Sequence, residues 1–359
     1  MKTNNNIPAY RFQGYTDAWE LRKLNNIADV RDGTHNSPRY IEFGYPLVTS
    51  KNIKNGQVNF EDIQYISSFD YEEINKRSKV NINDILMGMI GTVGNLALVR
   101  EEPEFAIKNV ALIKNIGVVN IEFLYHYLGS YVIERQLQNS LDGGTQKFIS
   151  LNKIRHLDIA FPSLPEQEVI GTFFSTLDQQ ITLHQRKLDT LKEQKKTYLK
   201  LLFPAKGQTQ PALRFQGFED DWEEVKLGEV VEKSGSGGTP KSTNKAYYGG
   251  NIPFLSITDI TQSGKYITNT EKTLTEIGLE NSSAWIVPKG AISLAMYASV
   301  GKLAILKTDV ATSQAFFNMV FSNEIVRDYV YFILDKAQLF NEWLPLISTG
   351  TQGNLNAQK

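Results

Sequence analysis

The sequence has no cysteine among its 359 residues. A chain without thiols forms no disulfide framework, binds no metal through thiolates and has no cysteine nucleophile. Because disulfides belong to oxidising compartments, their absence fits a protein of a reducing compartment.

Long hydrophobic runs are also missing. The most apolar stretch, residues 292–306, is interrupted by Lys302 and falls short of the roughly 18 apolar residues that a membrane span needs. The first six residues, MKTNNN, lack the apolar core of a signal peptide. We therefore expect a cytoplasmic protein that makes no membrane contact.

The chain has no excess of positive charge, since 38 basic residues face 39 acidic ones. A protein that held nucleic acid alone would be basic, because neutralised phosphates supply most of the affinity. The composition therefore argues against a self-sufficient DNA-binding protein. Any role on DNA requires a partner that supplies positive charge.

Signals of catalysis are absent as well. No GxGxxG follows a predicted strand, and the four histidines are scattered without metal-ligand spacing. The glycine-rich loop 235–242 resembles a phosphate-binding loop, but Pro240 stands where that loop needs glycine. We expect no metal, no cofactor and no catalytic residue in this chain.

The sequence contains one module twice. Residues 8–24 reappear as residues 211–227, so that Arg11 and Arg214, like Leu24 and Leu227, are 203 positions apart. A repeat of this length indicates a duplicated domain, because solenoid units are far shorter. Residues 46–53 and 84–94 are similarly matched by 253–260 and 291–301, each read as a strand that ends in a polar or small-residue turn.

Two further segments, 123–138 and 330–343, have the pattern of amphipathic helices, and each is followed by a Gly-Thr-Gln turn. Strands and helices in both copies predict an α+β (mixed α/β) fold with two similar globular domains. The predicted domains are 1–162 and 207–359, joined by residues 163–206.

The connecting segment has the pattern of a long coiled-coil helix. Ser163 and Glu166 predict a capping box at its start, and Pro204 predicts its end. Positions in alternating steps of four and three from Ile170 to Leu202 are apolar except His184 and Lys195, whose stems we expect to pack at the edge. This spacing is typical of a helix that packs along its length against another helix. We call this set the seam and expect it to form a subunit interface: Ile170, Phe174, Leu177, Ile181, Leu188, Leu191, Tyr198 and Leu202.

Polar loops and turns are the candidate recognition surfaces. Arg, Lys, Asn and Asp read base edges, whereas Ser, Thr and backbone N–H groups hold phosphates. The two copies keep their framework but differ in these loops, as expected of one scaffold adapted to two targets. The predicted DNA-binding residues are Arg31, Thr34, His35, Lys51, Asn52, Thr145, Gln146, Lys147, Thr239, Lys241, Thr258, Asp259, Tyr297, Thr351 and Gln352.

The order of these motifs resembles the DNA specificity subunit of type I restriction–modification systems. The resemblance covers nearly the whole chain and is carried by residues 11–14 with 19–20, 214–217 with 222–223, 238–241, 250–255, 143–146 and 161–168. It implies a non-catalytic subunit with two target-recognition domains, each of which reads half of a bipartite, asymmetric sequence in double-stranded DNA. It further implies methyltransferase subunits that use S-adenosylmethionine and restriction subunits that use ATP and Mg²⁺.

This sequence departs from the family pattern in one respect. Family members carry a second conserved spacer helix after the second domain, and a shift of about 206 positions would put it beyond residue 359. The seam would then be exposed, which soluble proteins rarely tolerate. We expect it to pair with a second copy or with the methyltransferase; a shortened gene product is the alternative explanation.

Two other functions stay open. One is a coiled-coil adaptor whose two heads bind proteins, and the other is a stand-alone hydrolase with a spatially assembled site. Neither explains why the two heads share a framework but differ in their polar loops.

Overall fold

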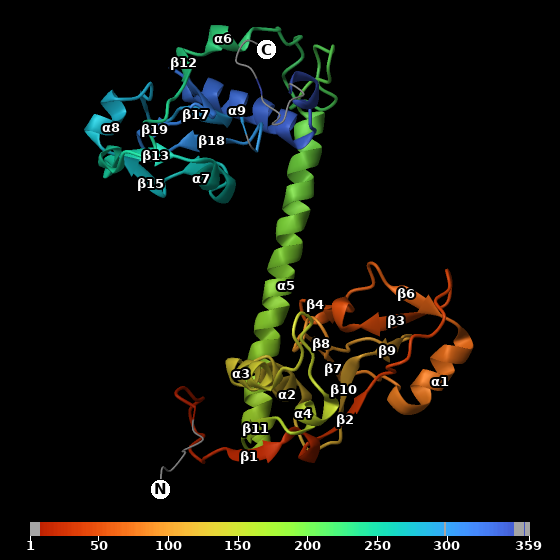
Figure 1. Cartoon of the computed structure of the whole chain (residues 1–359). Helices are drawn as coiled ribbons and strands as arrows, with labels where there is room; N and C mark the ends of the chain where they lie inside the picture. The colour runs from red at the N-terminus through yellow and green to blue at the C-terminus, as the bar shows by residue number, and fades with distance from the viewer. Residues whose placement is uncertain (1–7, 298, 348–354, 356–359) are drawn as a thin grey trace. The chain divides into compact units, whose positions relative to one another are not determined.

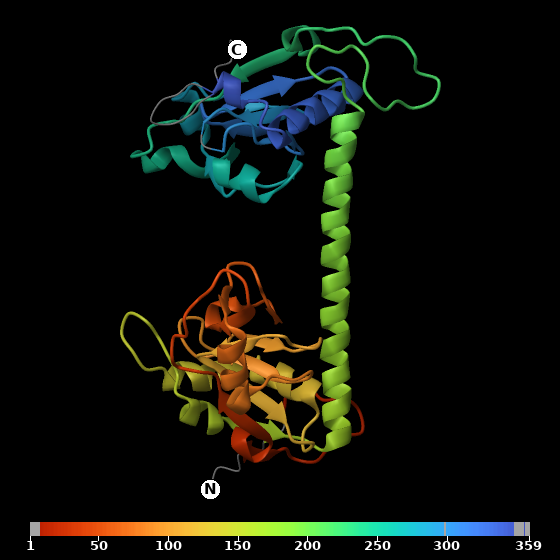
Figure 2. The ribbon, with the colours of Figure 1, turned by 90° about the vertical axis from the view of Figure 1, so that its right-hand side faces the viewer.

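The computed structural model describes residues 8–297, 299–347 and 355. By its internal packing the chain divides into two units, Met1–Gln185 and Arg186–Lys359. The division falls inside one continuous helix, α5 (Leu164–Leu201), which Figure 2 shows without interruption. The predicted domain boundaries at 162 and 206 stay predictions.

The first unit holds one mixed α/β domain. Its main sheet has the order β2-β10-β7-β8, a second sheet has the order β6-β3-β9, and two small ladders join β1 to β11 and β4 to β5. Its elements before α5 are β1 (Glu20–Lys23), η1 (Leu24–Asn26), β2 (Ala28–Asp32), β3 (Tyr45–Thr49), η2 (Ser50–Asn52), β4 (Ile53–Lys54), β5 (Gln57–Val58), β6 (Gln64–Ile66), α1 (Ser68–Ser78), β7 (Ile85–Gly88), β8 (Leu96–Leu98), β9 (Ala106–Lys108), β10 (Val110–Asn115), α2 (Ile121–Leu128), α3 (Tyr131–Ser140), α4 (Leu151–Arg155) and β11 (Asp158–Phe161).

Alternation along the central strand β10 places apolar groups on both faces of the main sheet. Ala111 and Ile113 pack with residues of α2, α3 and α4, whereas Val110 and Leu112 pack with residues of the second sheet. Figure 1 shows β10 and β7 between these helices on one side and β3 and β9 on the other. A strand that is buried on both faces is expected to be a continuous apolar run. The first four residues of β10, Val-Ala-Leu-Ile, form such a run and are all buried.

The second unit repeats this plan after the end of α5. Its main sheet has the order β12-β20-β17-β18-β14 and its second sheet the order β15-β13-β19-β16. Its elements are α6 (Leu227–Val230), β12 (Lys233–Ser236), η3 (Lys245–Tyr247), β13 (Tyr248–Leu255), α7 (Ile257–Gln262), β14 (Tyr266–Ile267), β15 (Lys272–Leu274), α8 (Glu276–Glu280), β16 (Ile286–Val287), β17 (Ile292–Ala295), β18 (Leu303–Leu306), β19 (Val310–Thr312), β20 (Phe316–Val320), α9 (Glu324–Leu339) and η4 (Leu344–Leu346).

The duplication inferred from the sequence is therefore confirmed in the topology. The orders β2-β10-β7-β8 and β6-β3-β9 correspond to β12-β20-β17-β18 and β15-β13-β19. In both second sheets the middle strand pairs in parallel, Val48 facing Ile107 in one and Leu255 facing Thr312 in the other. One face of each main sheet is covered by helices, α2 to α4 in the first domain and α9 in the second.

Four predicted elements differ in detail. The helix expected at 123–138 is two helices, α2 and α3, separated by Gly129 and Ser130; Asn120 and Ser130 are their N-caps. The helix expected at 330–343 is α9, which starts earlier because Asn323 caps its first turn. Both polar turns after the matched strands are helical, η2 and α7.

The first turn of α5 makes a long-range contact. Glu166 is 1% exposed and accepts two hydrogen bonds from Arg11, at 2.8 and 2.7 Å, and one from Trp19 Nε1 at 3.2 Å. Its carboxylate thus ties the first turn of α5 to the N-terminal segment; the predicted capping box stays a prediction. The last residue of the helix is Leu201, three positions before Pro204. Among the helices that the structure describes, none is long and apolar enough to cross a membrane.

Candidate nucleic-acid interface

The first predicted loop follows β2. Arg31 is paired with Asp29 at 2.7 Å and donates to the carbonyl of Arg77 at 3.2 Å. His35 lies with Nε2 at 2.8 Å from Asp32 Oδ2 and Nδ1 at 2.8 Å from Asn109 Oδ1. Asp32 is buried and also pairs with Arg77. The imidazole is thus exposed but held in place from two sides.

The corresponding loop of the second domain follows β12. Thr239 donates from Oγ1 to Gln314 Oε1 at 2.7 Å, and both side chains are exposed. Lys241, two positions further, is exposed as well. Trp285 supports the loop from beside it, because its Nε1 donates to the carbonyl of Ser236 at 3.2 Å.

Two predicted base-reading residues turn out to be internal caps. The amide of Asn52 is 2% exposed and accepts from Thr49 N and Oγ1 at 3.0 and 2.9 Å. At the matching position, the buried Asp259 accepts from Ser256 N and Oγ at 2.8 and 2.6 Å. These side chains close the first turns of η2 and α7, so we remove them from the candidate set.

Their predicted neighbours remain accessible. Lys51 is exposed and pairs with Asp62 at 3.0 Å, and Thr258 is exposed on α7. Tyr297, which follows β17, is 41% exposed.

The Gly-Thr-Gln turn of the first domain is an exposed loop. Asp142 and Phe148 close it through two backbone hydrogen bonds of 2.9 and 3.0 Å. The predicted residues in it are all exposed: Thr145, Gln146 and Lys147. Their counterparts Thr351 and Gln352 lie outside the described residues.

We call the surroundings of His35 and of Thr239 the tips of the two domains. Each tip contains a residue that the sequence did not single out: Asn109 beside His35 and Gln314 beside Thr239. Each lies two positions after a residue of the parallel strand pair, Ile107 or Thr312. The only sequence signal is a polar residue between two apolar strands, a pattern that many ordinary turns share.

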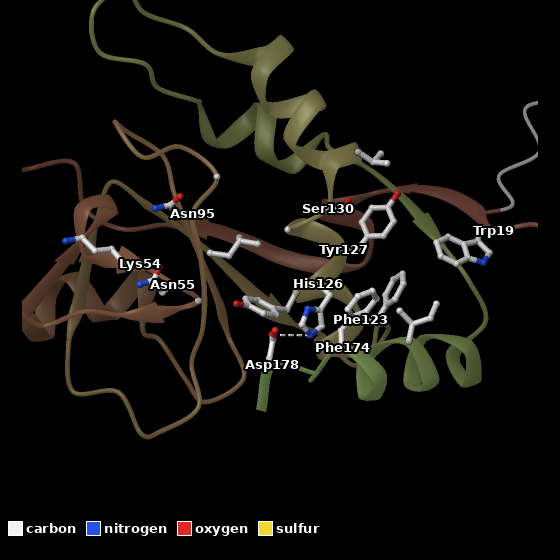
Figure 3. Close-up of a pocket in the computed structure, with 17 residues that line it drawn as sticks. Trp19, Lys54, Asn55, Asn95, Phe123, His126, Tyr127, Ser130, Phe174 and Asp178 are labelled. Atoms are coloured by element: carbon white, nitrogen blue, oxygen red, sulfur yellow. Dashed lines mark ion pairs between the residues drawn. The ribbon is translucent and has the colours of Figure 1, made fainter. Parts of the chain in front are cut away.

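A cavity of about 880 Å³ lies in the first domain between α2, the β4–β5 turn and the start of α5 (Figure 3). Trp19, Phe123 and Phe174 give it an apolar lining. His126 Nε2 is buried there without a hydrogen bond and lies 3.9 Å from Asp178 Oδ2. Burial lowers the pKa of His126, so the ring is neutral near pH 7.

Three aromatic rings pack together at the equivalent place of the second domain. Trp222 and Tyr329 stand 203 positions after Trp19 and His126, and Phe203 packs between them at ring distances of 6.1 and 5.7 Å.

The predicted seam of α5 divides into packed ends and an exposed middle. Ile170 packs against the first core, and Phe174 lies 5.3 Å from the ring of His126. At the other end Leu202, just beyond the helix, is half-buried, while Leu199, which the sequence did not single out, is buried. The remaining seam residues are between 38% and 66% exposed: Leu177, Ile181, Leu188, Leu191 and Tyr198.

Several known proteins are similar to this chain. "Type I restriction enzyme MjaIX specificity subunit" of Methanocaldococcus jannaschii is 34% identical over 132 residues, 36% of this chain and 30% of that protein. "Putative type I restriction enzyme MjaX specificity subunit" of the same organism is 26% identical over 261 residues, 66% of this chain and 58% of that protein. These two matches thus span 30% and 58% of the relatives' own length.

Solved structures share the fold. An S subunit of a type I restriction–modification system from M. genitalium has a TM-score of 0.58 at 16% identity, covering 96% of this chain and 82% of that one. A chain from a study of complex assembly and conformational transition of the type I R-M system has a TM-score of 0.50 at 17% identity, with coverage of 98% and 85%. A family model described as "Type I restriction modification DNA specificity domain" matches residues 16–193 and again 219–359. With two copies that together span most of its length, the chain belongs to the type I restriction–modification DNA specificity family.

Proposed function

We propose that this chain is the specificity subunit of a type I restriction–modification complex and that each domain reads one half of a bipartite, asymmetric DNA target. One observation carries the proposal: the same topology occurs twice, while the polar groups at equivalent exposed tips differ, His35 with Asn109 against Thr239 with Gln314. A duplicated scaffold with unlike tips suits two different half-sites.

The balanced charge supports a role for partner subunits. With 38 basic and 39 acidic residues, the chain lacks the surplus of cations that phosphate binding requires. We propose that methyltransferase subunits supply the missing positive charge and bind S-adenosylmethionine, and that restriction subunits bind ATP and Mg²⁺. The target adenine would be flipped into the methyltransferase, at a cost of a few kcal/mol of unstacking.

We further propose that α5 pairs through its seam with the same helix of a second copy. Two observations support a helical occupant: the exposed apolar stripe Leu177–Tyr198 and the open cavity beside Trp19 and His126. In the second domain Phe203, two positions beyond the end of α5, packs against Trp222 and Tyr329. Docking of a methyltransferase helix is the alternative.

Light scattering after size exclusion tests the pairing. We expect a dimer that L188E and L191E convert to a monomer, because a carboxylate in an apolar seam is costly to bury. K187E, on the polar face, is the matched control and should leave the dimer intact. A clean, stable wild-type monomer would contradict pairing with a second copy.

The function itself is tested by co-expression with the methyltransferase subunits in a host without adenine methylation. Sequencing that detects methylated adenine should find one bipartite motif when the chain is present and none without it. An adaptor with protein-binding heads would leave methylation independent of the chain. Activity of the purified chain alone on DNA or nucleotides would instead favour the hydrolase.

A further inference from the structure

The two exposed tips occupy equivalent positions in the two copies of the fold. β2 pairs Asp32 with Ala111, and β12 pairs Ser236 with Phe317. His35 and Thr239 each lie three positions after these strand ends, at the same place in the fold. We call His35–Asn109 and Thr239–Gln314 the tip pairs.

Both tip pairs stand on a rigid turn. Thr34 N donates to the carbonyl of Ile107 at 3.0 Å, and Gly238 N donates to that of Thr312 at 2.9 Å. The preceding glycine has no room for a side chain in either domain, since an added Cβ would lie 2.1 Å from Ile107 O at Gly33 and 1.9 Å from Thr312 O at Gly237. Such packing holds the tips in one geometry.

Asn109 is fixed more firmly than an ordinary loop residue. Its φ of +54° is a left-handed conformation, which asparagine tolerates better than most residues. Its N–H donates to Thr34 O at 3.1 Å, and its carbonyl accepts from Ser50 Oγ at 3.0 Å. With the backbone held at both ends, the direction of the side chain is set by His35.

Each tip pair contains an exposed carboxamide whose oxygen makes one contact with the other residue of the pair. Asn109 Oδ1 contacts His35 Nδ1 at 2.8 Å, and Gln314 Oε1 accepts from Thr239 at 2.7 Å. An amide oxygen has two lone pairs and the amide nitrogen two hydrogens, so one acceptor position and both donors stay open. A carboxamide with both functions open matches N6 and N7 of adenine in the major groove.

We propose that Asn109 and Gln314 are base-reading residues at equivalent positions of the two domains, each specifying one base of its half-site, with adenine as the matching base. His35 and Thr239 are positioning residues that fix the direction of the carboxamide. The inference rests on the proposed function and adds to it the side chains that distinguish bases.

The variants N109D and Q314E test the readout, because they keep the shape and replace the donor nitrogen by an acceptor oxygen. The chain is co-expressed with its methyltransferase subunits, and the methylated motif is determined. We expect N109D to change the accepted base at one position of one half-site and Q314E at one position of the other. N115D, which adds the same charge at the far end of β10, should leave the motif unchanged.

Equilibrium binding of the purified complex gives a second readout. Duplexes carry the wild-type motif or a single substituted base pair at each position of the half-sites. A good bidentate contact corresponds to a penalty of roughly 5- to 150-fold for the wrong base. In N109G, which preserves the left-handed backbone, the penalty at one position should fall to about one, whereas in N109D a different base pair should bind best at that position.

The outcomes separate the inference from the proposed function. If the wild-type chain directs methylation to a bipartite motif but N109D and Q314E leave the motif and every base penalty unchanged, the inference is wrong and the proposed function stands. The inference is equally wrong if both variants alter the same half-site. If the wild-type chain directs no motif, the proposed function fails and the inference falls with it.

The positioning role has its own signature. H35Q keeps a hydrogen-bonding group beside Asn109, whereas H35A removes it. We expect H35A to weaken discrimination at the same base pair as N109D, and H35Q to restore part of it. If H35Q restored discrimination at a different base pair, or restored none, His35 would not act by positioning Asn109.

Discussion

The hydroxyl of Ser293 donates a 2.7 Å hydrogen bond to Asn318 Oδ1, and both side chains are fully buried. Asn318 Nδ2 in turn donates to Thr312 Oγ1 at 2.8 Å and to the carbonyl of Gly235 at 3.1 Å. This polar network lies between the two sheets of the second domain. The strand registers put apolar residues at the same three positions of the first domain: Leu86, Leu112 and Ile107.

Removing the amide from this network should destabilise the second domain. N318A leaves the hydroxyls of Ser293 and Thr312 without their partner, which costs about 1–3 kcal/mol for each unsatisfied group. We expect the free energy of unfolding to fall by about 3 kcal/mol, measured by hydrogen exchange of β17 and β20 in urea.

An apolar replacement of the whole network provides the control. The triple variant S293A/T312V/N318L copies the chemistry of the first domain at similar volume and should lose less stability than N318A alone. A loss that grows with each added substitution would contradict this explanation.

The contact between Arg11 and Glu166 predicts a second stability effect. R11A leaves the buried carboxylate of Glu166 without its two hydrogen bonds from the guanidinium, and a buried charge that has lost its partner is destabilising. Urea unfolding of the full chain should show this loss in the transition of the first unit. The double variant R11A/E166Q should recover part of it, because the neutral amide is cheaper to bury.

Arg214 offers the matched control. It stands 203 positions after Arg11, and within the described part of the chain its buried Nη1 has no hydrogen-bond partner. R214A should therefore cost far less than R11A. Equal losses would show that the arginine stem, and not the ion pair, is what matters.

His126 predicts a dependence of stability on pH. Burial lowers its pKa below the ordinary value of 6.5. The carboxylates of Asp178 and Glu122 raise the pKa, but by less than burial lowers it. The unfolded chain then takes up the proton at a higher pH than the native chain does. The stability present above about pH 6.5 is thus lost as the pH falls through the lower native pKa.

Urea midpoints measured between pH 7.5 and 5 check this dependence. H126Y, which copies Tyr329 of the second domain, should reduce the slope, and H156Q, at an exposed histidine, should not. An unchanged slope in H126Y would assign the dependence to another group.

The turn below the first tip pair predicts a steric effect. In G33A the new Cβ would meet the carbonyl of Ile107 at 2.1 Å, so that the turn or β9 must move. Overpacking of this kind costs about 1–3 kcal/mol. Thermal unfolding should show the loss, and under the proposed function base discrimination should relax in one half-site.

G144A serves as the control for G33A. An added Cβ at Gly144 meets nothing within 4 Å, so its effect on stability should stay within about 0.5 kcal/mol. A comparable loss in both variants would mean that the lost glycine flexibility, and not the contact with Ile107, is responsible.

Much of the architecture could be predicted from local pattern. The 203-residue repeat and the helical periodicity of 163–206 are properties of neighbouring positions, and both are confirmed by the matching strand orders and by α5. The candidate site was harder to predict from the sequence. Asn52 and Asp259 looked like exposed polar turn residues, but a side chain that caps its own turn has the same sequence signature as one that reads a base.

By itself, the sequence determined that this protein is a duplicated α+β scaffold joined by a long amphipathic helix, because periodicity and repetition are written along the chain. Only the tertiary structure decided which polar groups face outward. Asn109 meets His35 across 74 residues, Gln314 meets Thr239 across 75, and Glu166 meets Arg11 across 155. Such contacts depend on strand pairing between distant segments, and no local pattern of residues encodes them.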